Sequence, residues 1–110
     1  MLTDSHSHTC HFSSDAEMSI SELIRGCEQN GVKRIVITEH YDYDYPHPEE
    51  PSQVFDIKQY VEAFDVWKKL SSTVELNMGI ELGYQSHIAS IIDEVSLILC
   101  LQVPHLIQLF

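Results

Sequence analysis

Short apolar runs alternate along this chain with segments in which apolar residues recur at helical spacing. That alternation constrains its fold more than any other feature. A brief strand is predicted to end near Asp4, a second lies around residues 35–37, and a third lies within residues 74–84. The consecutive β-branched residues at 35–37 are typical of a strand that is buried on both faces. Because repeated strand–helix units form parallel sheets with right-handed crossovers, the sequence predicts an α/β fold.

The stretches between these strands carry the periodicity and the end signals of helices. Ser19 and Glu22 have the spacing of a capping box, in which each side chain accepts a hydrogen bond from the other residue's backbone. Apolar residues then recur at helical spacing as far as Gly31, which is a natural helix end. A second helix is predicted to start near Asp56 and a third to cover residues 87–99, and a fourth strand could follow it.

Polar side chains follow each predicted strand at its carboxyl end. His6 and His8 come after the first strand, His40 after the second, and Glu81 at the end of the third. In parallel sheets chemistry sits at this edge, because the loops that carry functional groups begin there. We therefore expect these side chains to lie close together.

The opening residues have the pattern Asp-x-His-x-His. His6 and His8 lie two positions apart, so in an extended segment both imidazoles project from the same face. Two neutral imidazoles placed in this way can bind one divalent ion, although a solvated, histidine-rich N-terminus would have the same pattern. Asp4 strengthens the metal interpretation, because its carboxylate could orient a ligating imidazole.

Glu81 is an acid inside an apolar predicted strand, between Gly79 and Gly83. An ionised carboxylate in such a place must be paired or bound to a metal, because burying it bare is prohibitive. The alternative, an exposed position on an edge strand, is less favoured. His40 follows a buried run, where ligands and catalytic groups are common, and Glu39 beside it is either a supporting partner or a solvent-exposed residue.

The loop after the first predicted strand offers two further candidates. Asp15 is either a ligand supplied by this loop or a turn residue before the helix, and His11 is close enough to compete for the same role. A longer, acidic and proline-bearing loop is predicted over residues 41–51.

The charge of the chain argues against two classes of partner, and its cysteines and apolar segments indicate the compartment. The chain of 110 residues has 6 basic and 17 acidic residues, a net charge of −11, which argues against binding to nucleic acid or to an anionic membrane. Its 3 cysteines form no CxxC pair, which favours reduced thiols. With no signal peptide and no apolar span at the length a membrane requires, we expect a cytoplasmic protein.

Segments that occur in the order DSHSHTCHFSSDA, ITEHYDYDYP and GIELGYQSH carry a family resemblance. They resemble the opening motifs of the polymerase-and-histidinol-phosphatase (PHP) superfamily, and most narrowly those of its histidinol-phosphatase branch. The resemblance covers roughly residues 1–90. It implies a distorted seven-stranded β/α barrel, similar to a TIM barrel, with two or three divalent metal ions at its carboxyl-terminal face.

The resemblance also implies which residues bind the metals. His6 and His8 would bind one ion, Glu81 would bridge it to a second, and Asp15 and His40 would bind the third. Mixed imidazole and carboxylate ligands suit zinc, manganese or iron. The implied reaction is metal-assisted hydrolysis of a small phosphorylated substrate, L-histidinol phosphate, to L-histidinol and phosphate in histidine biosynthesis.

The chain is short for such a barrel, which needs about 200 to 250 residues. We expect residues 1–110 to be a single partial PHP domain that supplies the first three or four units and ends in an atypical tail at residues 96–110. The family's later ligands, including a closing Asp-x-His pair, are missing, and His105 is the only candidate for the first of them. Activity should therefore depend on the missing part, and exposed strand edges should leave the isolated chain marginal, aggregation-prone or dependent on a partner.

Two other interpretations stay open. The chain could belong to another PHP enzyme, such as a general phosphoesterase or a polymerase-associated exonuclease, although its negative charge weighs against a nucleic-acid substrate. It could also be a non-catalytic module that binds metal or a partner.

Overall fold

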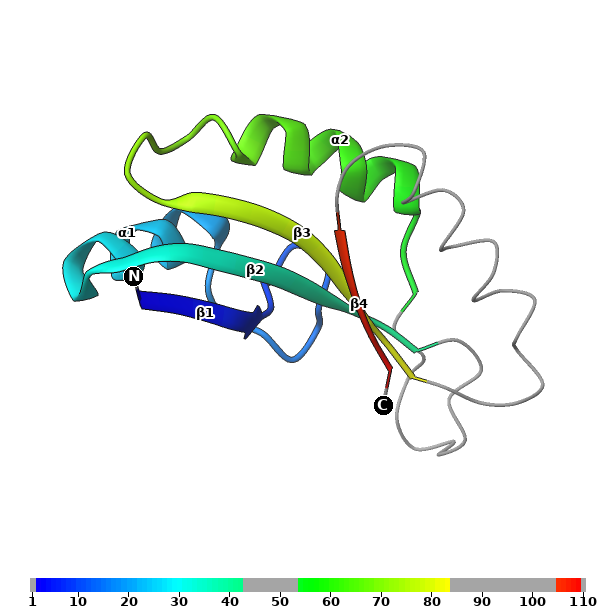
Figure 1. Ribbon diagram of the computed structural model, residues 1–110. Helices are drawn as coiled ribbons and strands as arrows, with labels where there is room; N and C mark the ends of the chain where they lie inside the picture. The colour runs from blue at the N-terminus through cyan, green and yellow to red at the C-terminus, as the bar shows by residue number, and fades with distance from the viewer. Residues whose placement is uncertain (1, 43–53, 84–104, 110) are drawn as a thin grey trace.

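The computed structural model describes residues 2–42, 54–83 and 105–109, and in this part of the chain strands and helices alternate. The elements are β1 (Leu2–Ser7), α1 (Ile20–Asn30), β2 (Val32–Tyr41), α2 (Ile57–Trp67), β3 (Glu75–Leu82) and β4 (His105–Leu109). The strands form one sheet in the order β1-β2-β3-β4, and each neighbouring pair is parallel (Figure 1). The predicted α/β fold with a parallel sheet is confirmed, whereas the helix expected at residues 87–99 lies outside the described residues.

Helix α1 begins and ends where its sequence signals predict. The Ser19 hydroxyl accepts a hydrogen bond from the backbone N–H of Glu22 at 3.2 Å, and the Glu22 carboxylate accepts one from the Ser19 N–H at 3.3 Å. This capping box satisfies donors that the first turn of a helix leaves without partners. At the other end Gly31 has a φ of 72°, a left-handed conformation that favours glycine and ends the helix.

The hydrophobic core lies between the helices and one face of the sheet. Ile35 and Ile37 of β2 belong to a single buried cluster with residues of α1, α2 and β3. Side chains alternate between the two faces of a strand, so Val36 and Thr38 lie on the other face, and they are buried as well. The predicted burial of this strand on both faces is confirmed.

Strand β1 extends further than the sequence predicted. It does not end near Asp4 but continues to Ser7, with an irregular register between these two residues. The Asp4 carboxylate accepts hydrogen bonds from the His6 N–H at 3.0 Å and from the Ser7 hydroxyl at 2.9 Å. These contacts hold the end of the strand in its irregular path beside β2.

Strand β4 lies within the predicted tail and pairs with β3. His105 is its first residue and is in register with Met78, whereas Gln108 is the register partner of Glu81. The backbone therefore places His105 at the beginning of its strand, away from the carboxyl end where β3 carries Glu81. Neither helix of the described part has the length and apolar character needed to cross a lipid bilayer.

Tyr60 joins α2 to the sheet and provides a test of this packing. Its side chain is fully buried, and its hydroxyl lies 3.1 Å from the carbonyl oxygen of Ile37 and 2.9 Å from that of Gly79. Tyr60→Phe should lower the free energy of unfolding by about 1 to 2 kcal/mol, because it removes a buried donor from two carbonyl groups. Urea denaturation measures this change. Val66→Ala, at an exposed position of α2, serves as the control, and an equal loss in both variants would contradict the assigned role.

Candidate metal centre

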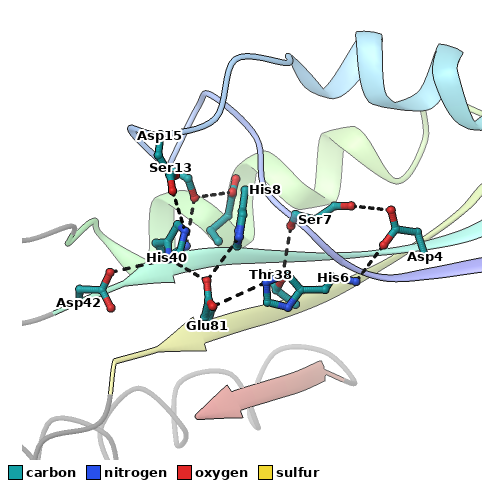
Figure 2. Close-up of polar contacts among 11 residues, drawn as sticks. Asp4, His6, Ser7, His8, Ser13, Asp15, Thr38, His40, Asp42 and Glu81 are labelled. Atoms are coloured by element: carbon teal, nitrogen blue, oxygen red, sulfur yellow. Dashed lines mark hydrogen bonds and ion pairs between the residues drawn. The ribbon is translucent and has the colours of Figure 1, made fainter. Parts of the chain in front are cut away.

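The parallel pairing of β2 with β3 places His40 directly beside Glu81. The two residues are register partners, and strand alternation puts both on the sheet face opposite the helices (Figure 2). Nδ1 of His40 lies 2.7 Å from Oε2 of Glu81. Both side chains are largely buried, with exposed fractions of 17% and 13%.

The histidines of the opening motif reach the same carboxylate from β1 and the residue that follows it. Nε2 of His6 lies 3.6 Å from Oε1 of Glu81, and Nε2 of His8 lies 3.4 Å from Oε2. His6, His8 and Glu81 each offer one ligand atom, and these atoms all lie within 4.8 Å of one another. Figure 2 shows the two imidazoles pointing toward Glu81.

Asp15 joins this group from the loop between β1 and α1. Its Oδ2 lies 3.1 Å from Nε2 of His40. The His40 ring also stacks on the His8 ring, with 4.1 Å between their centroids. The structure thus brings together the five residues that the family resemblance implies as metal ligands, which are His6, His8, Asp15, His40 and Glu81.

His11, the competing candidate in this loop, lies elsewhere. Its Nε2 accepts a hydrogen bond from the backbone N–H of Ile20 at 3.2 Å, and its ring packs on Trp67 with 5.4 Å between centroids. Because Ile20 opens α1, His11 satisfies one of the donors left free at the start of that helix. Of the two alternatives left open by the sequence, Asp15 is the one at the cluster.

Two buried atoms of the cluster have no hydrogen-bond partner among the described residues. They are Oε2 of Glu81 and Nδ1 of His8. Oε2 of Glu81 does lie close to two imidazole nitrogens, but these contacts lack the alignment of a hydrogen bond. A buried carboxylate oxygen in this condition is costly unless a cation or a donor compensates it. Two imidazoles and a carboxylate are a donor set that suits a zinc, manganese or iron ion, so these residues fit a divalent metal.

Asp42 also lies at the cluster, and sequence reasoning missed it. Its Oδ2 is 3.7 Å from Nδ1 of His40, and its side chain is 16% exposed. Burial raises the pKa of Asp42, His40 opposes this rise, and the carboxylates of Glu81 and Asp15 add to it. Gly83 leaves the necessary room, because a Cβ atom there would clash with Oδ1 of Asp42. Asp42 falls within the stretch predicted to be a loop, which hid its position directly after β2.

Glu39 supports the loop that carries Asp15, and the prediction that it could be solvent-exposed is wrong. The residue is fully buried. It accepts hydrogen bonds from the Thr9 N–H at 2.7 Å, from the Thr9 hydroxyl, and from the Ser13 hydroxyl at 2.9 Å. Strand alternation explains the burial, because Glu39 points to the face opposite that of His40, under the loop.

The burial of Glu39 predicts a characteristic dependence of stability on pH. Burial raises the pKa of Glu39 above its ordinary value of 4.5, and the hydrogen bonds from Thr9 and Ser13 oppose this rise. The neutral form is then favoured by folding, so Glu39 contributes stability below pH 4.5 that is lost as the pH rises through the raised pKa. Glu39→Gln stays neutral and should gain stability relative to the wild type as the pH rises above 4.5 and through the raised pKa.

Urea denaturation of the metal-free proteins across this pH range measures the effect. Glu62→Gln, which removes a charge at an exposed position of α2, is the matched control. A constant difference between Glu39→Gln and the wild type would show that the Glu39 carboxyl group titrates normally.

Comparisons with known proteins agree with this fold and these motifs. The family model of the PHP domain matches residues 4–108. A probable histidinol-phosphatase of Clostridium acetobutylicum is 39% identical over 88 residues, which are 78% of this chain and 33% of the relative. The chain thus spans about a third of the length of this curated relative.

A solved structure is similar over most of the described sheet and helices. It is the histidinol phosphate phosphatase of Lactococcus lactis, crystallised with zinc, L-histidinol and phosphate, and it matches with a TM-score of 0.73 and 22% identity. The match covers 84% of this chain and 34% of that protein. These findings confirm the predicted resemblance to the PHP superfamily and its histidinol-phosphatase branch. Because the family model matches nearly the whole sequence, the chain belongs to the PHP domain family.

Proposed function

We propose that this chain is the N-terminal part of a metal-dependent phosphate monoester hydrolase that converts L-histidinol phosphate and water to L-histidinol and phosphate. The observation that carries the proposal is the convergence of His6, His8 and His40 on Glu81, whose buried Oε2 lacks a hydrogen-bond donor among the described residues. The family, the curated relative and the ligands of the similar structure support this substrate. In this proposal the described strands are the first part of a β/α barrel, and later strands supply further ligands.

We assign the ligands in two groups. His6, His8 and Glu81 would hold one ion, and Asp15 and His40 would hold another. The separations of 3.6 and 3.4 Å between the imidazole nitrogens and Glu81 support the first group. They are close to the roughly 3.4 Å expected between two ligands that each lie about 2.1 Å from a tetrahedral zinc ion.

In the proposed reaction the residues of this chain would hold the ions at the carboxyl edge of the sheet, on the side of the cluster that is open to solvent. The charge of the bound ions would offset the repulsion between this acidic chain and an anionic substrate. Bound divalent ions supply Lewis-acid polarisation and positive charge at the phosphoryl group. Without them the acids Asp15, Asp42 and Glu81 would repel a phosphate, as would the net charge of −11. His6, with an exposed fraction of 37%, lies at the open side of the cluster, where a phosphate ester would approach.

Removing the carboxylate of Glu81 should abolish tight metal binding. Glu81→Gln keeps the shape of the side chain but loses its charge, and we expect its affinity for zinc to fall about 100-fold or more. Competition with a chromogenic chelator measures the affinity. Glu75→Gln is the matched control, because Glu75 lies on the same strand but is 53% exposed and pairs with Arg34. Equal zinc affinity of the wild type and Glu81→Gln would contradict the assignment.

The reaction itself is tested best in a chimera. The segment of this chain that matches the Clostridium acetobutylicum protein replaces the corresponding segment of that protein. We expect the metal-loaded chimera to release phosphate from L-histidinol phosphate in preference to nucleoside monophosphates, and we expect the Glu81→Gln chimera to be inactive. The 110-residue chain alone should release none, since other ligands come from later strands. A folded, metal-loaded chimera with no activity on L-histidinol phosphate would refute the proposed function.

A further inference from the structure

One fully buried acid lies next to the metal cluster without being part of it. Glu39 precedes His40 in β2, and its side chain points to the opposite face of the sheet. The residues that contact it, Thr9 and Ser13, come from the loop between β1 and α1 and are buried as well. Among the described residues, the hydrogen-bond donors to this carboxyl group all come from that loop, so Glu39 can fix the position of the loop.

The contacts of Glu39 span the loop at two points. The Thr9 N–H and hydroxyl donate to separate carboxyl oxygens, and the Ser13 hydroxyl donates to Oε1 at 2.9 Å. Within the loop, the Ser13 N–H donates to the Thr9 carbonyl oxygen at 3.0 Å. Glu39 thus clamps both ends of a tight turn against β2.

Ser13 connects the clamped turn to the strand that carries His40. Its Oγ also accepts a hydrogen bond from the backbone N–H of His40 at 3.0 Å. Asp15 follows two residues later, and the Ala16 N–H returns to the Ser13 carbonyl oxygen at 3.2 Å. The backbone around Asp15 is therefore tied to the strand that carries His40.

Asp15 needs such support because its own surroundings do little to fix it. Its side chain is 58% exposed, yet its Oδ2 lies 3.1 Å from Nε2 of His40. An exposed side chain with free rotation would lose conformational entropy on binding an ion. A clamped backbone reduces that cost and keeps the carboxylate in reach.

We propose that Glu39 is a positioning residue for the half of the metal centre formed by Asp15 and His40, acting through Ser13 and the clamped loop. This inference rests on the proposed metal centre and deepens it. Glu39 is not itself a proposed ligand, and it holds the loop that carries Asp15. Its loss should therefore weaken the half formed by Asp15 and His40 selectively. In the other half, His6 lies on β1 and Glu81 on β3, and His8 alone adjoins the clamped loop, directly before Thr9.

Cobalt titration of the full 110-residue chain tests this selectivity. The visible absorption of bound cobalt should develop in two steps, and His6→Ala and Asp15→Asn should each remove a different step. Glu39→Gln should weaken the step that Asp15→Asn removes by about tenfold or more, and the other step by less than about threefold. Glu62→Gln, exposed on α2, is the matched control and should leave both steps unchanged.

Two further measurements separate positioning from general stability. Thr9→Val removes the hydroxyl that donates to Glu39 while keeping the shape of the side chain, and Thr9→Ser keeps the hydroxyl. Thr9→Val should weaken the step that Asp15→Asn removes, as Glu39→Gln does. Thr9→Ser should leave that step as strong as in the wild type. In the metal-free proteins, Glu39→Gln should speed amide hydrogen exchange in residues 10–16 without speeding that of α1 or β2.

The cobalt titrations distinguish failure of the positioning role from failure of the proposed metal centre. If the wild type binds cobalt in two steps and Glu39→Gln leaves both unchanged, or weakens both equally, the positioning role is overturned while the proposed metal centre stands. If the wild type binds no cobalt, the proposed function fails and the positioning role fails with it. If Glu39→Gln does not fold by circular dichroism, the comparison of Thr9→Val with Thr9→Ser decides the question.

Discussion

The parallel, in-register pairing of β2 with β3 is the constraint on which the candidate site depends. It makes His40 and Glu81 neighbours, and strand alternation turns both away from the hydrophobic core. A shift of one residue in either strand would send one of these side chains into the core and out of the cluster. The same alternation turns Glu39 to the opposite face, where it holds the loop. One strand therefore serves both sides of the sheet with consecutive residues.

Much of this arrangement could be predicted from the sequence because the signals are local or follow from strand alternation. The capping box at Ser19 and the left-handed Gly31 depend only on nearby residues, and both agree with the structure. The grouping of His6, His8 and Glu81 followed from the rule that parallel strands end at one edge of the sheet. That rule predicts which side chains lie at the same edge of the sheet, and it needs no knowledge of long-range packing.

The remaining features depend on contacts between residues far apart in the chain. The burial of Glu39 is set by Thr9 and Ser13, and no local pattern shows that a loop about 30 residues away will cover it. The helix-capping role of His11 likewise depends on where the loop turns back to α1. Asp42 reached the cluster because β2 continues to Tyr41, beyond the point where the acidic stretch indicated a loop.

Crystals of the zinc-loaded 110-residue chain would test the central claim most directly, through anomalous diffraction at the zinc absorption edge. We expect an anomalous peak bonded to Nε2 of His6, Nε2 of His8 and the carboxylate of Glu81, whose ligand atoms lie within 4.8 Å of one another in the structure. A zinc peak bound elsewhere, with these side chains bonded only to one another or turned apart, would contradict it.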